Sequence, residues 1–188
     1  KEGYPGDYDT PEQRVGAFNN TRPWETCMTI CQQWAWKPKD KLKSLEKCIH
    51  TLVQTAGGDG NLLFNVGPMP NGEIEPRQVD RLREIGAWLK TNGASIYGTR
   101  GGPFLPATWG CSTHKDNNIF VHVLQWPENN LQLPVLGEKI KSATLMNGDA
   151  VEWQQNEEGV FITLDKEKQD PIDTIVVLTT DVPMGTTP

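Results

Sequence analysis

Two amphipathic segments in the first half of the chain predict helices. The first segment has Pro38 near its start and ends at Gly57-Gly58, and the second begins at Pro76 and ends at Asn92-Gly93. In each segment apolar residues recur at spacings of three and four, which is the period of one helix face. They are Leu42, Leu45, Ile49, Leu52, Val53 and Ala56 in the first, and Val79, Leu82, Ile85, Trp88 and Leu89 in the second.

Two predicted strands alternate with these helices. The segment 24–30 alternates in polarity and contains Thr and Ile, and the segment 61–66 is an almost continuous apolar run, as expected for a strand covered on both faces. The order strand, helix, strand, helix predicts parallel strands joined by right-handed crossovers. Residues 1–23 are rich in Gly, Pro, Asp and Asn, which predicts a long ordered loop.

The pattern changes after Gly98. The sequence Gly101-Gly102-Pro103 interrupts regular secondary structure. Short β-rich runs separated by turn residues follow it. This spacing predicts a small antiparallel β-sandwich. We therefore expect an α/β part over residues 1–102 and an all-β domain over residues 103–188. The runs span residues 119–125, 139–146, 160–164 and 174–179.

Length and charge exclude several classes of protein. An eight-unit β/α barrel takes about 250 residues, so a chain of 188 residues cannot hold a complete one. The net charge of −6 argues against nucleic acid or an anionic membrane as a partner. No apolar run approaches the roughly 20 residues that span a bilayer. The start at Lys1 without Met indicates an internal or processed chain, so the missing signal peptide gives no information on localisation.

The four cysteines predict neither a zinc site nor a redox pair. They form no Cys-x-x-Cys motif and have few His residues near them. We expect free structural thiols, because free Cys is usually buried. The residues are Cys27, Cys31, Cys48 and Cys111.

Three stretches resemble one family of glycosidases. Carboxylate and indole side chains stand at strand ends in Arg22–Lys37, and the resemblance continues through Asn61–Pro68 and Arg81–Arg100. Together they resemble the C-terminal portion of the retaining α-L-fucosidases of glycoside hydrolase family 29. The resemblance implies the final strand–helix units of a (β/α)8 barrel followed by a β-sandwich. It also implies hydrolysis of terminal α-L-fucose from glycans without a metal or an organic cofactor, with the rest of the barrel upstream of Lys1 as the partner of this chain.

A retaining glycosidase uses two carboxyl groups about 5 to 5.5 Å apart. The resemblance implies that the nucleophile is an Asp on an earlier barrel strand, which this chain lacks. It also implies that Glu12, within Thr10-Pro-Glu-Gln13, is the general acid/base. Glu25 is the alternative, because a carboxylate on a buried strand is costly unless it is paired. An ion pair with an Arg, or capping of backbone donors, would equally explain Glu25.

Aromatic residues and one amide are the candidates for sugar binding. Trp34 and Trp36 alternate around Ala35, so one indole could line a pocket while the other packs beneath it, and both could equally be core. The resemblance implies that Trp34 touches the methyl group of fucose. Trp24 stands at a strand end, and Asn65 could contact ligand or fix the turn that follows it.

Two hypotheses on function follow. The chain is either part of an active fucosidase, or a non-catalytic fragment whose β-sandwich binds glycans or only packs. A quarter of a barrel alone would leave sheet edges and an apolar face uncovered, which predicts aggregation or a partner. The resemblance implies a protein that acts in the periplasm, in a lysosome or outside the cell.

Overall fold

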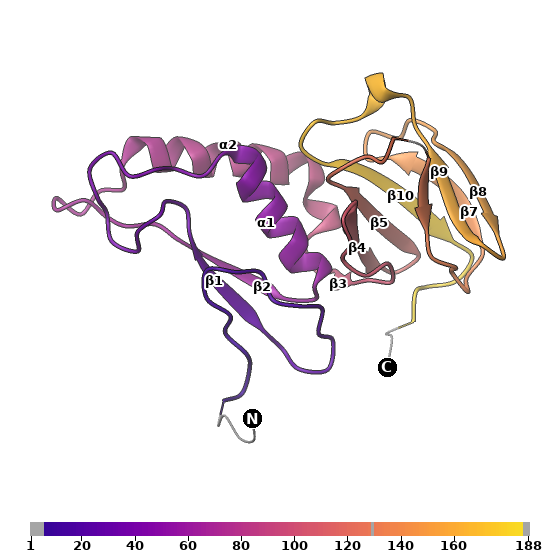
Figure 1. The fold of residues 1–188 in the computed structure, drawn as a ribbon, viewed down its shortest axis with the longest axis horizontal. Coiled ribbons are helices and arrows are strands. Elements are labelled where there is room, and N and C mark those ends of the chain that lie inside the picture. The colour runs from indigo at the N-terminus through magenta and orange to yellow at the C-terminus, as the bar shows by residue number, and fades with distance from the viewer. Residues whose placement is uncertain (1–5, 129, 186–188) are drawn as a thin grey trace.

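The first half of the molecule contains two parallel strands and two helices in alternation. The structure, a computed structural model, describes residues 6–128 and 130–185. Figure 1 shows the two helices on the same side of the strand pair. The elements in order are β1 (Glu25–Thr29), α1 (Leu45–Gly57), β2 (Asn61–Asn65), α2 (Pro76–Asn92) and a short 3-10 helix, η1 (Gly93–Ser95).

Local signals set the ends of both helices. Helix α2 begins at Pro76 and ends before Gly93, which confirms the predicted bounds. Helix α1 ends at Gly57, as predicted, but the expectation that it starts near Pro38 is wrong. The helix starts after Ser44, whose side chain accepts a hydrogen bond from the backbone N–H of Lys47 at 3.1 Å. The segment after Pro38 forms a turn instead, in which Lys39 has a φ of 60°.

Residues 9–12, called the third segment below, pair with the edge of β1 that β2 leaves open. Strand β1 pairs in parallel with β2, from Glu25 opposite Asn61 to Thr29 opposite Asn65. On its other edge, Asp9 forms a parallel bridge with Trp24, and Glu12 forms one with Cys27. The prediction of a long ordered loop is confirmed for residues 6–23, which contain no regular element but form these two isolated bridges, while residues 1–5 lie outside the described residues. This segment is too short and too polar to show a strand pattern.

The two faces of this small sheet differ in burial. On the helix side, Thr26 and Met28 are buried, and Ile49 and Val53 of α1 lie in the core. On the opposite side, Leu63 is 45% exposed. The prediction that the second strand is covered on both faces is therefore wrong for this chain, because the helices pack on one side only.

The second half forms two antiparallel sheets around one hydrophobic core. The first sheet has the order β3-β4-β5-β10-β7, and the second has the order β6-β9-β8. Their inward residues, such as Val121, Leu178 and Ile162, belong to one cluster of buried side chains. The elements are β3 (Arg100–Gly101), β4 (Gly110–Lys115), β5 (Asn118–Val123), β6 (Leu131–Leu133), β7 (Ile140–Leu145), β8 (Glu152–Asn156), β9 (Gly159–Thr163), η2 (Lys166–Lys168) and β10 (Thr174–Thr180).

The four β-rich runs of the sequence correspond to β5, β7, β9 and β10, so these predictions are confirmed. Strands β3, β6 and β8 were not predicted, and neither was β4. Its Ser112 and Thr113 are polar yet fully buried, and both hydroxyls are hydrogen bonded to distant backbone carbonyls, those of Phe104 and Ser95. No helix of the described residues is long and apolar enough to cross a membrane.

The two halves meet where α1 packs against β4. Cys111 contacts the backbone carbonyl of Val53 at 3.4 Å, and a Cβ added to Gly57 would lie 2.3 Å from the Cys111 sulfur. His122 and Asp173 form a fully buried hydrogen bond of 2.7 Å nearby. All four cysteines are free, as predicted.

Candidate active site

Glu12 lies on the uncovered face of the small sheet. Residues paired across neighbouring strands share a face, and Glu12, Cys27 and Leu63 are paired in one row. Leu63 lies on the face opposite the helices, and Glu12 is exposed there. The candidate carboxylate therefore projects from the side of the sheet that no described element covers.

The register places Glu12 and Glu25 at different depths on this face. Glu12 is level with Cys27, so it lies two residues, about 6.6 Å, closer to the carboxyl ends of the strands than Glu25. Glu25 is level with Asn61, the first residue of β2. Active sites of parallel β/α folds lie at the carboxyl ends of the strands. The register therefore favours Glu12 over Glu25 for chemistry.

The structural explanation offered for Glu25 has little support. Within residues 6–128 and 130–185, no Arg or Lys forms an ion pair with Glu25. Its side chain is half-buried, on the same face as Glu12. Its backbone N–H donates to the carbonyl of Asp9 at 2.9 Å, so Glu25 helps to pair the third segment with β1.

Asp40 fixes the loop that carries the two candidate indoles. Its buried carboxylate accepts hydrogen bonds from the backbone N–H groups of Gln33 at 2.9 Å, Lys41 at 2.8 Å and Gln32 at 3.1 Å. The N–H of Gln33 above all holds the pKa of Asp40 below its ordinary value, although burial opposes this shift. The Asp40 carboxylate thus holds the loop after β1 through hydrogen bonds to its backbone. Trp34, on this loop, is 39% exposed at the carboxyl end of the strands.

Asn65 holds this loop from the neighbouring strand. Its side-chain amide donates to the backbone carbonyl of Trp34 at 2.9 Å. Gly67 lets the two segments approach, because a Cβ at Gly67 would lie 2.4 Å from the backbone nitrogen of Trp36. Trp36, whose backbone nitrogen makes this contact, has a half-buried side chain. Asn65 therefore positions the loop of Trp34, in addition to any contact with a ligand.

Trp24 lies at the other end of β1 and has a packing role. Its side chain is 3% exposed, and the indole N–H donates to the carbonyl of Gly58 at 3.1 Å. The ring fills the space beside Gly16 and Gly60, where an added Cβ would lie 2.9 and 2.3 Å from ring atoms. This placement argues against contact between Trp24 and a substrate at the carboxyl ends.

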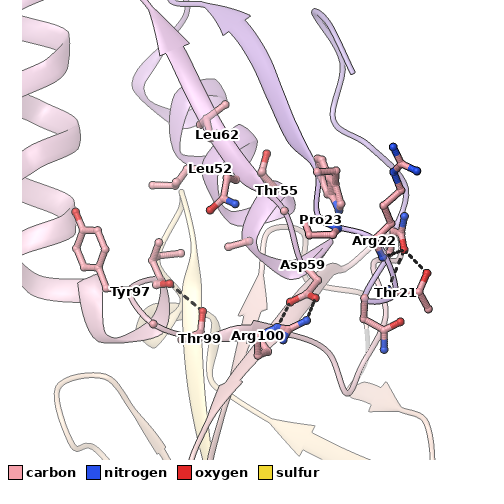
Figure 2. A pocket seen from close by; sticks show the side chains of 18 residues that line it. Thr21, Arg22, Pro23, Leu52, Thr55, Asp59, Leu62, Tyr97, Thr99 and Arg100 are labelled. Atoms are coloured by element: carbon pink, nitrogen blue, oxygen red, sulfur yellow. Dashed lines mark hydrogen bonds and ion pairs between the residues drawn. The ribbon is translucent and has the colours of Figure 1, made fainter. Parts of the chain in front are cut away.

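A hollow of about 720 Å³ opens at the amino ends of the strands (Figure 2). Asp59 and Arg100 both line it. The Asp59 carboxylate accepts hydrogen bonds from the Arg100 guanidinium at 2.8 Å and from the Gly101 N–H at 2.7 Å. Burial tends to raise the pKa of Asp59, but the hydrogen bonds from Arg100 and Gly101 outweigh it and lower the pKa. The hollow lies at the wrong end of the strands for barrel chemistry, so we assign Asp59 a structural role. The described residues contain no group of three His, Cys, Asp or Glu side chains able to hold a metal ion.

Comparison with known proteins decides the family. The family model for α-L-fucosidase matches residues 1–94, and the model for the α-L-fucosidase C-terminal domain matches residues 104–180. The chain belongs to the α-L-fucosidase family. Human plasma α-L-fucosidase is 31% identical over 155 residues, which cover 75% of this chain and 33% of that protein. Rat tissue α-L-fucosidase is 32% identical over 156 residues, with the same coverage of both chains.

Solved α-L-fucosidases have the same fold over nearly the whole chain. Isoenzyme 1 from Paenibacillus thiaminolyticus superposes with a TM-score of 0.84 at 30% identity, covering 95% of this chain and 46% of that one. The Thermotoga maritima α-fucosidase in complex with fucose gives a TM-score of 0.76 at 26% identity, covering 94% and 43%. The chain thus spans about a third of these curated relatives and less than half of these solved chains.

Three polar residues of this chain were missed by the sequence analysis. They are Gln13, Asp40 and Lys43, which hold the segments that carry Glu12 and Trp34. The Lys43 ammonium donates to the backbone carbonyls of Thr29 and Cys31, the latter at 3.0 Å, and its burial lowers its pKa. No motif marks these residues, because their main partners lie 7 to 16 positions away in the sequence.

Proposed function

We propose that this chain is the C-terminal portion of a retaining exo-α-L-fucosidase that removes terminal fucose from glycans. In this proposal residues 1–102 complete a (β/α)8 barrel, and residues 103–188 form a β-sandwich domain. The exposed position of Glu12 on the uncovered face of the sheet is the observation that carries the proposal. That face would be the inner face of the closed barrel, and the substrate would bind at its rim, at the carboxyl ends of the strands.

The backbone groups on the outer edge of the third segment support the proposal that the sheet continues beyond it. The Pro11 carbonyl and the Gln13 N–H both bond to Cys27, at 3.1 and 2.9 Å. In a parallel ladder the intervening residue directs its N–H and C=O to the opposite edge. The backbone of Glu12 therefore faces the place where a preceding barrel strand would pair, and such a strand would carry the nucleophilic Asp.

The proposed chemistry would use two carboxyl groups, that of Glu12 and that of an Asp on an earlier barrel strand. The upstream Asp would attack the anomeric carbon while Glu12 donates its proton to the departing glycosidic oxygen. The ionised Glu12 would then take a proton from the water that hydrolyses the fucosyl-enzyme ester. Both half-reactions are acid–base and nucleophilic steps for which side chains suffice, so we propose no cofactor.

The sugar-binding part of the proposal centres on Trp34. Its exposed indole at the carboxyl ends would form the apolar wall against the methyl group of fucose. Asn65 would act through the Trp34 carbonyl that it holds, and the half-buried Trp36 would pack beneath Trp34. Trp24 is left out of the proposed binding site because it is buried at the other end of β1.

We also propose that the enzyme acts outside the cytoplasm, in the periplasm, in a lysosome or in the extracellular space. The support is that two of its relatives are plasma α-L-fucosidases. The proposed partners are a fucosylated glycan as substrate and the upstream part of the barrel.

Hydrolysis of 4-nitrophenyl α-L-fucoside tests the proposal, with the 188-residue chain and the full-length protein assayed side by side. We expect activity in the full-length protein only, because the nucleophile lies upstream. Activity of the short chain alone would disprove the division of the two carboxyl groups between the parts. An inactive full-length protein would favour the non-catalytic alternative, a glycan-binding or structural fragment.

A further inference from the structure

We infer that Gln13 is a positioning residue for the general acid/base, an inference that rests on the proposed fucosidase function. Gln13 directly follows Glu12 and has a φ of 54°. This left-handed conformation is uncommon for residues other than glycine, and such conformations cluster at functional sites. It changes the direction of the backbone immediately after Glu12.

Both polar atoms of the Gln13 side-chain amide contact Thr29. The nitrogen donates to the Thr29 hydroxyl at 3.2 Å, and the oxygen accepts from the Thr29 backbone N–H at 3.4 Å. The Gln13 backbone N–H also donates to the Cys27 carbonyl at 2.9 Å. Gln13 thus closes the end of the third segment onto the carboxyl end of β1.

Thr29 is a rigid anchor for this contact. It is 1% exposed, and its hydroxyl donates to the Cys31 carbonyl at 2.5 Å. The Lys43 ammonium binds the carbonyls of both Thr29 and Cys31. The amide of Gln13 therefore contacts a residue that Lys43, just before α1, already holds in place.

A second threonine holds the other side of the turn. The Thr26 hydroxyl lies 3.1 Å from the Pro11 carbonyl and 2.5 Å from the Arg14 carbonyl. The residues on both sides of Glu12 are thus fixed to β1, while Glu12 itself stays exposed. This arrangement suits a carboxyl group that must meet a glycosidic oxygen with little positional error.

The inference predicts a specific loss of acid catalysis. An aryl fucoside with a good leaving group, such as 2,4-dinitrophenolate, departs without protonation, whereas phenolate needs the proton from Glu12. If Glu12 is less firmly positioned, hydrolysis of the phenyl fucoside should become slower, while hydrolysis of the dinitrophenyl fucoside should change little. A purely structural role for Gln13 would slow both substrates equally.

The test uses the full-length enzyme with Gln13→Gly, Thr29→Val and Thr29→Ser, and kcat/KM as the readout. Gln13→Gly keeps the positive φ but removes the amide. Thr29→Val removes the hydroxyl that accepts from the amide, and Thr29→Ser restores it. We expect Gln13→Gly and Thr29→Val to lower kcat/KM for the phenyl fucoside about 10- to 100-fold, part of what general acid catalysis supplies, and for the dinitrophenyl fucoside less than about 3-fold. Thr29→Ser and the exposed control Gln154→Ala should resemble the wild type.

Equal losses on both substrates, or no loss on either, would overturn the inference. Glu12→Ala in the same assay separates this failure from failure of the proposed function. One outcome is that the loss of kcat/KM depends on the leaving group in Glu12→Ala but not in Gln13→Gly or Thr29→Val. That outcome would disprove only the role of Gln13. If Glu12→Ala shows no such dependence, the acid/base assignment itself falls, and the inference with it.

Discussion

Glu12 and Cys27 are direct neighbours in parallel register, held by backbone hydrogen bonds on both sides of Glu12. Three extended segments, and not two strands, therefore build the uncovered face. The carboxylate of Glu12 lies in one row with the side chains of Cys27 and Leu63. This row fixes both the face and the depth at which the proposed chemistry takes place.

Trp34→Ala should weaken recognition of the fucose methyl group. The proposed contact is apolar, and a single methyl group in such a pocket contributes about 1–3 kcal/mol, or 10- to 200-fold in kcat/KM. We expect the preference of the full-length enzyme for an aryl α-L-fucoside over the matching β-D-arabinopyranoside, which lacks that methyl, to fall toward unity. Trp34→Phe should keep most of the preference. An unchanged preference in Trp34→Ala would exclude Trp34 as the methyl-binding wall.

Gly57→Ala should destabilise the protein because the junction has no room for a methyl group. The added Cβ would lie 2.3 Å from the sulfur of Cys111, so overpacking should cost about 1–3 kcal/mol. Gly86→Ala is the matched control, because Gly86 lies within α2 and meets nothing within 4 Å. It should stabilise by roughly 0.4–1 kcal/mol. Thermal unfolding checks both signs, and a neutral Gly57→Ala would refute the tight contact.

Asp59→Asn should lower stability at neutral pH, and its effect should fade in acid. The hydrogen bonds from Arg100 and Gly101 favour the ionised form, so the pKa of Asp59 is lower in the folded state than in the unfolded state. Such a group stabilises the fold above its unfolded pKa of about 3.9, and this contribution disappears as the pH falls through the lower folded value. Hydrogen bonds to a charged group contribute about 1.5–3 kcal/mol, which sets the expected loss at neutral pH.

Melting temperatures of wild type and Asp59→Asn between neutral pH and the lowest pH at which both stay folded check this effect. Asp165→Asn is the control, since Asp165 forms only an exposed ion pair with Lys168 and should change little. A difference between wild type and Asp59→Asn that does not narrow as the pH falls would contradict the assignment.

Local sequence signals were sufficient where structure depends on neighbouring residues. Pro76 and Asn92-Gly93 gave the ends of α2, and the apolar runs gave β5, β7, β9 and β10. The start of α1 was missed because a distant contact, the Asp40 carboxylate with the loop after β1, holds the intervening residues in a turn.

The candidate site depended on long-range contacts even more. Glu12 and Trp34 were found through family resemblance, which carries no geometry. The segment that holds Glu12 has no strand pattern, and its pairing with β1 joins residues 15 positions apart. Gln13 and Lys43 act through contacts 12 to 16 residues away, which no periodicity reveals.

Azide rescue in the full-length enzyme tests the central claim, that Glu12 is the general acid/base, most directly. Glu12→Ala should slow hydrolysis of phenyl α-L-fucoside about 10²- to 10⁴-fold, the range of general acid–base catalysis. With an activated aryl fucoside, azide should restore part of the rate and give a fucosyl azide of retained configuration, because azide needs no general base to attack the fucosyl-enzyme. Glu25→Ala should show no rescue. Normal rates in Glu12→Ala together with azide rescue of Glu25→Ala would contradict the account and move the proton transfer to Glu25.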